Sequence, residues 1–238
     1  MSTSLSLLPR VSANQLGEFA FGTQRQKMAI VYNHKFGNPH CAPYYQLALN
    51  GVLRSFHNGH YDTVCLRNEA LNLQQRPPQS PNQAARLRNN ATMLLQFASI
   101  TPQTTPPSGQ HQVVRRNAFM PLDGVVISVR PEILTRLHNS RDFSYTKLRF
   151  SKSAASADAS ELILLVLLEY GNRQNSALAT FRPDQTILVD CFARTIHRGH
   201  RLPAIRRHQL SAALREYRNL WATTRRANPA TGSQSAAR

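Results

Sequence analysis

The 238-residue chain is long enough to bury a hydrophobic core, and its longest apolar run, Leu162–Leu168, is too short to span a bilayer. Its 29 Lys and Arg against 12 Asp and Glu give a formal net charge of +17, which favours a polyanionic partner such as a nucleic acid. Three cysteines (Cys41, Cys65 and Cys191) argue against a disulfide framework and predict a reducing, cytoplasmic location.

Residues 1–100 are expected to form a helical N-terminal region. Ser12 is a suitable N-cap for a short helix that carries Leu16 and Phe19 on one face. Apolar residues then recur at helical spacing, and a proline-rich break at residues 76–81 interrupts them. The further predicted helices cover about Pro43–Phe56, Thr63–Gln74 and Asn82–Ile100.

Residues 101–112 are rich in Thr, Pro, Ser, Gly and Gln, which predicts a linker and a domain boundary. Beyond them β-branched runs indicate strands, with Glu132–Arg136 as the hairpin partner or continuation of Gly124–Val129. Residues 225–238 are small and polar and predict a disordered basic tail. The other elements expected in between are strands over Ser144–Phe150, Gln185–Asp190 and Phe192–His197, and helices over Asp158–Tyr170 and Pro203–Trp221.

The element order from about Asn82 to Trp221 resembles the PD-(D/E)XK, or restriction-endonuclease-like, superfamily, whose core is helix, three strands, helix, strand. The resemblance implies an α+β fold, in which the helical N-terminal region precedes a mixed β-sheet flanked by helices. Residues 113–224 would form the α/β nuclease-like domain. In Arg130-Pro131-Glu132 the glutamate matches the first motif acid, and Lys147 or Lys152 matches the motif lysine.

Enzymes of that superfamily hold Mg²⁺ with two or three carboxylates, and the metal activates water and polarises the phosphate. The acid that should stand two residues before the lysine is replaced by Tyr145 or Phe150. Loss of this acid predicts a pseudo-nuclease without catalysis, cofactor or metal. The carboxylates left as substitutes are Asp142 in a loop and Glu161 and Glu169 on the following helix.

Histidines and cysteines are concentrated in one stretch of the sequence. They could bind zinc, or the histidines could lie on the surface beside a buried thiol. No pair of cysteines has the spacing of a zinc finger, so no metal is predicted. The group comprises His34, His40, Cys41, His57, His60 and Cys65.

Arginines near the C-terminus give the most persuasive functional pattern. Residues 201–238 hold eight basic residues and a single acid, Glu216, and helical spacing places Arg207, Arg215 and Arg218 on one broad face. Arginines so arranged can bind phosphate oxygens. The predicted nucleic-acid-binding residues are Arg115, Arg116, Arg194, Arg198, Arg201, Arg206, Arg207, Arg215 and Arg218.

The sequence therefore predicts a non-catalytic nucleic-acid-binding subunit that works on DNA or RNA with other protein subunits, as in a defence or mobile-element complex. Two alternatives stay open. One is a metal-dependent nuclease that uses Glu132, a lysine and an acid from elsewhere in the chain. The other is a protein–protein adaptor whose basic surface meets an acidic partner.

Overall fold

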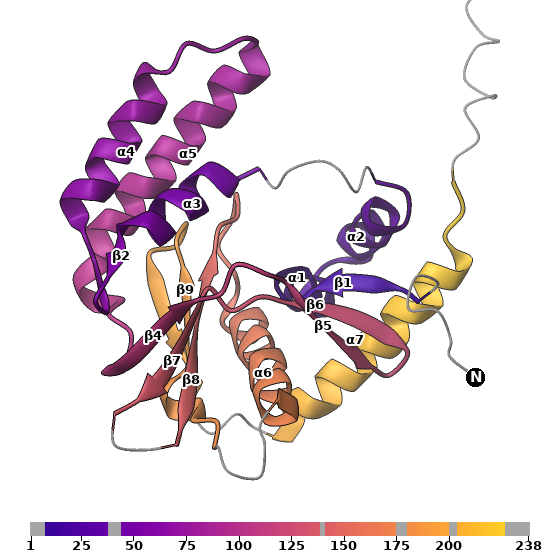
Figure 1. The fold of residues 1–238 in the computed structure, drawn as a ribbon. Helices are drawn as coiled ribbons and strands as arrows, with labels where there is room; N and C mark the ends of the chain where they lie inside the picture. Colours follow the sequence, from indigo (N-terminus) through magenta and orange to yellow (C-terminus); the bar gives the residue numbers. More distant parts are fainter. Residues whose placement is uncertain (1–7, 38–43, 139–140, 175–179, 200–203, 227–238) are drawn as a thin grey trace, which may run out of the picture.

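The structure is a computed structural model that describes residues 8–37, 44–138, 141–174, 180–199 and 204–226. Helices and mixed sheets make up the molecule, which confirms the predicted α+β class. The larger sheet has five strands in the order β10-β9-β8-β7-β4 (Figure 1). These are β4 (Gly109–Val113), β7 (Ile133–Leu137), β8 (Phe143–Arg149), β9 (Ile187–Asp190) and β10 (Thr195–Arg198).

The strand directions in this sheet explain how the chain is connected. β4, β7 and β8 pair antiparallel, whereas β8 and β9 are parallel, with Leu148 opposite Val189. Parallel neighbours need a crossover connection. The helix α6 (Ala157–Gln174) supplies most of it, and the 3-10 helix η3 (Pro183–Gln185) leads into β9. β10 then turns back antiparallel to β9 at the edge of the sheet.

Three N-terminal helices lie close to where the apolar spacing predicts them. The Asp62 carboxylate caps the second, accepting the N–H groups of Val64 and Cys65, and the third begins with Pro81 after the N-cap Ser80. Residue 43, the expected start of the first, lies outside the described residues. The helices are α3 (Gln46–Ser55), α4 (Thr63–Gln75) and α5 (Pro81–Ile100), with a short hairpin of β2 (Phe56–His57) and β3 (His60–Tyr61) between the first two.

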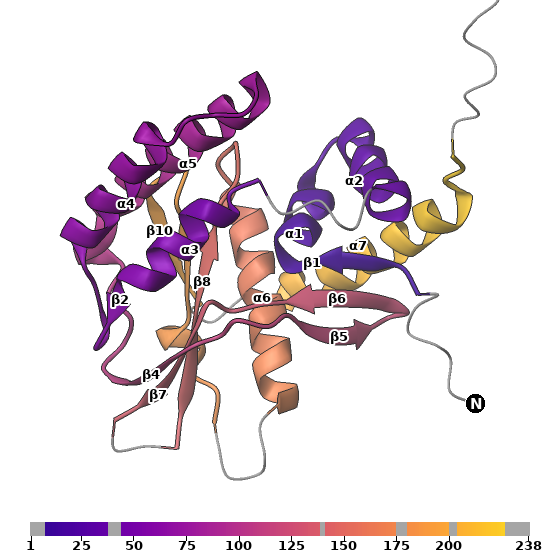
Figure 2. The ribbon, with the colours of Figure 1, turned by 45° about the horizontal axis from the view of Figure 1, so that its top comes forward.

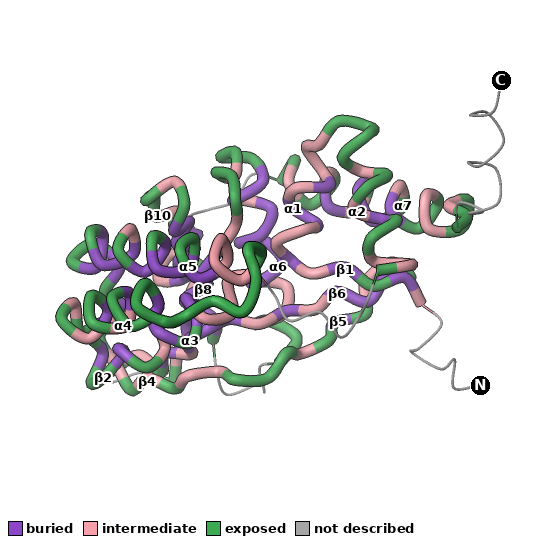
Figure 3. Tube along the Cα trace, turned by 90° about the horizontal axis from the view of Figure 1, so that it is seen from above, coloured by how far each residue is buried: buried purple, intermediate pink, exposed green. Residues whose placement is uncertain are grey.

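Alternating residues of the central strands enter two hydrophobic cores. On β9, Leu188 packs in the core that contains α6, whereas Ile187 and Val189 pack in the core formed with α3–α5. Figures 1 and 2 show α6 on one side of the sheet and α3–α5 on the other. In Figure 3 buried segments run through α5, β8 and α6, while the outer helix faces are exposed. The sheet is therefore covered on both faces.

A second, three-stranded sheet lies beside α6 and has the order β1-β6-β5. Its β5–β6 hairpin turns through Asp123 and Gly124, which both have positive φ (48° and 77°), as a tight two-residue turn requires. β1 joins from the N-terminus and runs parallel to β6, with Val11 opposite Ile127. The strands are β1 (Arg10–Ser12), β5 (Ala118–Leu122) and β6 (Val125–Val129).

The N-terminal segment packs with the C-terminal half of the chain. Ser12 caps α1 (Ala13–Phe21) as predicted, its hydroxyl accepting the Gln15 N–H at 3.2 Å. The helix α2 (Gln24–Phe36) begins at a capping box of Thr23 and Gln26 and was not predicted, because Val31 is its one buried residue. Both helices share a core with α6 and with α7 (Ala204–Thr223).

Two predictions between the helical region and the sheet are wrong. Residues 101–112 contain the 3-10 helix η2 (Thr101–Gln103) and most of β4 instead of a bare linker. An edge strand needs few apolar residues, and Gly109 fits because an added Cβ would lie 2.2 Å from the Arg136 carbonyl oxygen. In addition, β7 pairs with β4 and β8, not with β6, because the unpredicted β5 occupies one side of β6.

No helix among the described residues combines the length and the apolar character needed to cross a membrane. Most of the predicted disordered tail, residues 227–238, lies outside the described residues.

Candidate functional site

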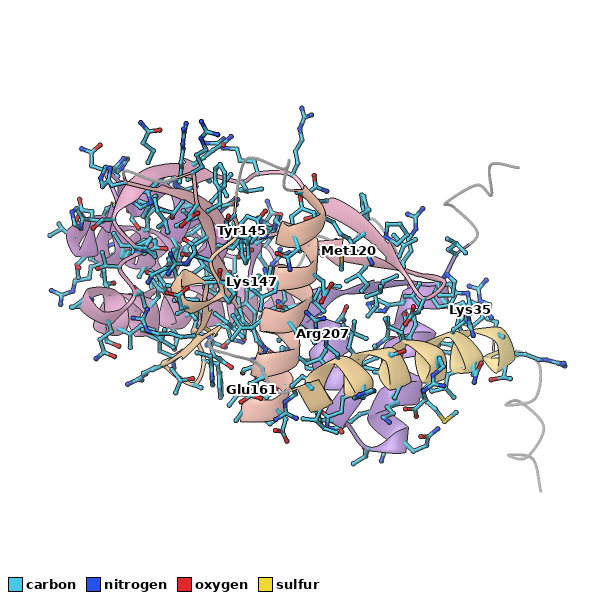
Figure 4. The ribbon with its side chains drawn as sticks, turned by 90° about the horizontal axis from the view of Figure 1, so that it is seen from below. Lys35, Met120, Tyr145, Lys147, Glu161 and Arg207 are labelled. Carbon is cyan, nitrogen blue, oxygen red and sulfur yellow. The ribbon has the colours of Figure 1, made fainter. Side chains whose placement is uncertain are left out.

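Glu132 and Lys147, matched from the sequence to a motif acid and lysine, are in direct contact. Glu132 immediately precedes β7, and Lys147 lies on the adjacent β8 (Figure 4). The Lys147 Nζ donates to both Glu132 carboxylate oxygens, at 2.9 and 3.1 Å, and the Leu148 N–H donates to Oε2 at 2.7 Å. The Lys147 and Glu132 side chains are only 8% and 1% exposed. They form a buried ion pair whose geometry is fixed by the strand pairing.

Tyr145 stands where the second acid would be needed. Its ring packs against Phe181, with centroids 4.7 Å apart, and burial raises the pKa of its hydroxyl. The oxygens of Glu132 are occupied by Lys147 and Leu148, so this carboxylate is poorly placed to bind Mg²⁺. Among the described residues, no three His, Cys, Asp or Glu side chains are grouped so that they could hold a metal ion.

The carboxylates that could substitute for the missing acid are engaged elsewhere. Asp142 lies 3.3 Å from the guanidinium of Arg182. Glu161 on α6 binds Arg206 at 2.6 Å, and Glu169 lies 3.3 Å from Arg207. These residues hold surface elements together rather than adding oxygens to the Glu132 site.

A second buried cluster was missed from the sequence. The Arg149 side chain is 1% exposed, and it donates to Asp190 at 2.8 Å, to Glu18 at 2.6 Å and to the Ser153 carbonyl at 2.7 Å. Asp190 in addition accepts three backbone N–H groups, one from the segment between β8 and α6 and two from the turn after β9. The cluster joins α1, β8 and β9. Its partners are far apart in the sequence, so no local pattern could reveal it.

The predicted arginines of α7 divide into two kinds. Arg206 donates to Glu161 and Asp158 and its side chain is only 12% exposed, so it fastens α7 to α6. Arg207 is 70% exposed although it lies near Glu169, and Arg215 and Arg218 are exposed on the outer side of the helix. Figure 4 shows Arg207 and Glu161 near the junction of α6 and α7.

The remaining predicted arginines lie elsewhere. Arg194, in the β9–β10 turn, and Arg198 are exposed at one edge of the large sheet. Arg115 and Arg116 are exposed just after β4, at the opposite edge. Arg201 lies outside the described residues. The fold therefore distributes the predicted residues over separate basic surfaces, and the group on α7 is defined below as the α7 face (Arg207, Arg215 and Arg218).

All the carboxylate side chains of the chain are described, and each has a partner within the protein. Ion pairs, helix capping or hydrogen bonds engage them. By contrast, Arg215 and the predicted arginines at the two sheet edges make no ion pair within the described residues. The twelve engaged acids are Glu18, Asp62, Glu69, Asp123, Glu132, Asp142, Asp158, Glu161, Glu169, Asp184, Asp190 and Glu216.

Two adjoining cavities of about 320 and 420 Å³ form a groove beside α3. They share Gln46, Leu49 and Arg130 in their walls. The smaller cavity exposes part of the Glu132–Lys147 pair, and the larger one is bordered by Arg115 and Arg54. This feature, called the α3 groove below, brings a predicted arginine close to the predicted acid and lysine.

The histidine and cysteine group is not brought together in the described part of the chain. His34 lies between α1 and α7, near the Tyr217 hydroxyl and the Gln15 side chain, and burial lowers its pKa to about 4. His57 and His60 lie in the β2–β3 hairpin, which packs with the other core. Burial raises the pKa of Cys65. His40 and Cys41 lie outside the described residues.

Comparison with known proteins gives no relative: no family model matches the chain, and the curated proteins contain no match to it. The inference about function therefore depends on the geometry and charge of the chain itself.

Proposed function

We propose that this protein is a non-catalytic nucleic-acid-binding subunit that acts with other proteins on DNA or RNA. The observation that carries the proposal is the internal use of every carboxylate. With the acids engaged inside the protein, much of the +17 charge is left as exposed arginine. Exposed arginines that make no ion pair within the described residues, such as Arg215, suit phosphate oxygens, which accept their forked N–H donors.

The arrangement of the large sheet supports the resemblance to the PD-(D/E)XK superfamily. α5 precedes three antiparallel strands, β4, β7 and β8, and α6 then leads to a parallel fourth strand, β9. This is the order of helix, three strands, helix and strand, with the β5–β6 hairpin inserted after the first strand. The contact between Glu132 and Lys147 on adjoining strands adds to the resemblance.

The same site favours binding without catalysis. Metal-dependent hydrolysis of a phosphodiester relies on several carboxylates around the ion. Here one carboxylate is present, its oxygens are held by Lys147 and Leu148, and an aromatic side chain, Tyr145, replaces the second. The residues present do not fit a magnesium centre, so we derive no hydrolytic step.

Binding of the purified protein to labelled single- and double-stranded DNA and RNA, measured over a salt series with Mg²⁺ present, tests the proposal. We expect binding that weakens steeply with salt and leaves the substrate intact, because phosphate contacts release counterions. Cleavage would replace the proposal with the nuclease alternative. No binding to any nucleic acid, together with tight binding to an acidic protein, would replace it with the adaptor alternative.

A further inference from the structure

The smaller cavity of the α3 groove combines an aromatic wall with a cationic rim. Its volume of about 320 Å³ is near the lower end of the roughly 300–1,000 Å³ typical of small-ligand sites. Tyr44 and Tyr45 form one wall at the start of α3, and Leu49 and Leu148 provide apolar surface. This combination of surfaces suits a ligand that has both a flat ring and a negative charge.

The two tyrosines are held in place before any ligand arrives. Three side chains of α5 fix Tyr44: Asn89 donates to its hydroxyl at 2.8 Å, and Asn90 and Arg86 donate to its carbonyl at 3.0 and 3.2 Å. The Tyr45 ring meets that of Tyr44 edge to face, with centroids 5.0 Å apart. A rigid aromatic pair loses little entropy on binding, which makes it an effective stacking surface.

Positive charge surrounds the same tyrosines. The walls include Arg130, Lys147 and Lys152 against a single carboxylate, Glu132. Glu132 is paired with Lys147 at 2.9 Å and lies 3.6 Å from the Arg130 guanidinium, so this one acid leaves an excess of positive charge. The Lys152 ammonium lies over the Tyr44 ring, 4.5 Å from its centroid. A cation–π contact at an exposed site contributes only about 0.5–1 kcal/mol, so the ammonium can leave the ring for a phosphate.

One residue in the cavity wall carries a buried acceptor that lacks a partner. The Asn14 side-chain oxygen is buried and makes no hydrogen bond, and Asn14 lines the cavity. Buried polar atoms are rarely left unsatisfied in a folded protein. A rotation of the Asn14 side chain toward the cavity would let this oxygen accept N–H groups from the edge of a nucleobase.

We propose that the smaller cavity of the α3 groove binds one unpaired nucleotide of a single-stranded nucleic acid. The base stacks on the Tyr44–Tyr45 wall with its edge toward Asn14, and the phosphate is bound by Lys152 and Arg130. A base in a duplex has no free face to offer, so the cavity selects single strands. This inference rests on the proposed nucleic-acid-binding function, and it adds that the protein prefers single-stranded nucleic acid.

Fluorescence of 2-aminopurine, placed in the middle of a single-stranded oligonucleotide, tests the stacking. We expect quenching on binding to wild type and to the variant Tyr44→Phe/Tyr45→Phe, which keeps both rings. The matched variant Tyr44→Leu/Tyr45→Leu should lose the quenching and about tenfold in affinity, in line with the cost of removing a base–aromatic stack. Tyr32→Leu on α2, another exposed ring, should change neither readout. The Phe variant keeps the test valid if the Leu variant fails to fold.

Other outcomes separate this inference from the proposed function. Salt-dependent binding that treats duplex and single strand alike, with no effect of the Leu variant, would overturn the nucleotide site and leave the proposed function standing. Displacement of the oligonucleotide by an equal concentration of a 5′-mononucleotide would assign the cavity to a free nucleotide instead. Absence of binding to any nucleic acid would overturn both.

Discussion

The Glu132–Lys147 pair and the α7 face both carry charge, but the protein treats these two regions in opposite ways. The pair is buried between adjacent strands, and the Lys147 Nζ lies 2.9 Å from the nearer Glu132 carboxylate oxygen. The α7 face is exposed, and two of its three arginines make no ion pair within the described residues. Buried charge must be compensated, whereas exposed charge is solvated and available to a partner.

This difference teaches that a residue matched to a nuclease-like motif need not be available to a ligand. The residues that resemble catalytic groups hold each other and stabilise the sheet. The residues proposed to bind phosphate lie on α7, along the sheet edges and around the α3 groove. Substitutions in the Glu132–Lys147 pair should therefore lower stability, whereas substitutions on the α7 face should weaken binding.

The largest expected effect comes from breaking the buried pair. Lys147→Met leaves Glu132 charged and buried, which should lower the free energy of unfolding by about 3–5 kcal/mol. Adding Glu132→Gln removes that charge while its amide oxygen still accepts the Leu148 N–H, and should recover much of the loss. Urea unfolding of wild type, the two single variants and the double variant measures the coupling. Equal stability of wild type and Lys147→Met would show that the pair is not buried as described.

A smaller effect is expected from pH at the inner side of α7. Burial lowers the pKa of His34 to about 4 from 6.5, so the neutral ring is preferred in the folded protein. Its contribution is fully present above pH 6.5 and is lost as pH falls toward 4, at most about 3 kcal/mol. Urea unfolding of wild type and His34→Gln between pH 7 and 4.5 should show a shallower pH dependence in the variant. Identical profiles would count against this assignment.

The adjacent arginines Arg206 and Arg207 give the finest comparison. Arg206→Ala removes the contacts to Glu161 and Asp158 and should lower the free energy of unfolding by about 1 kcal/mol, since both acids are partly exposed. Arg207→Ala should change it by less than about 0.5 kcal/mol, because exposed pairs contribute little. Thermal unfolding of the two variants measures this difference in stability. Similar losses in both would remove the distinction between the clamp and the exposed face.

The sequence predicted the elements whose signal is local. Ser12 as a cap, the prolines before α5 and the apolar run of α6 identify helices because capping, ring geometry and burial act within a few residues. The strand β4 was missed because an edge strand needs little apolar surface, and the partners of β6 were mistaken because strand pairing depends on distant segments.

The candidate site was predictable to the same extent. The motif proposed Glu132 as an acid and Lys147 or Lys152 as the lysine, and the structure places Glu132 in contact with Lys147. The contacts of Arg149 with Asp190 and Glu18 could not be predicted, because these partners lie 41 and 131 positions away in the sequence. The use of Arg206 as a clamp was hidden for the same reason, because its acids lie on α6, 45 and 48 positions earlier.

The most direct test of the central claim, that the arginines of the α7 face bind phosphate, is the salt dependence of nucleic-acid binding in two matched triple variants. One carries Arg207→Glu, Arg215→Glu and Arg218→Glu on the α7 face. The other carries Arg67→Glu, Arg76→Glu and Arg88→Glu, which are exposed on or beside α4 and α5 and give the same change in net charge.

We expect the α7 variant to bind at least tenfold more weakly, with a flatter dependence on salt, because each lost phosphate contact lowers the slope by about 0.9. The α4–α5 variant should stay closer to wild type. Equal losses in both variants would show that only net charge matters and would contradict the assignment of binding to the α7 face.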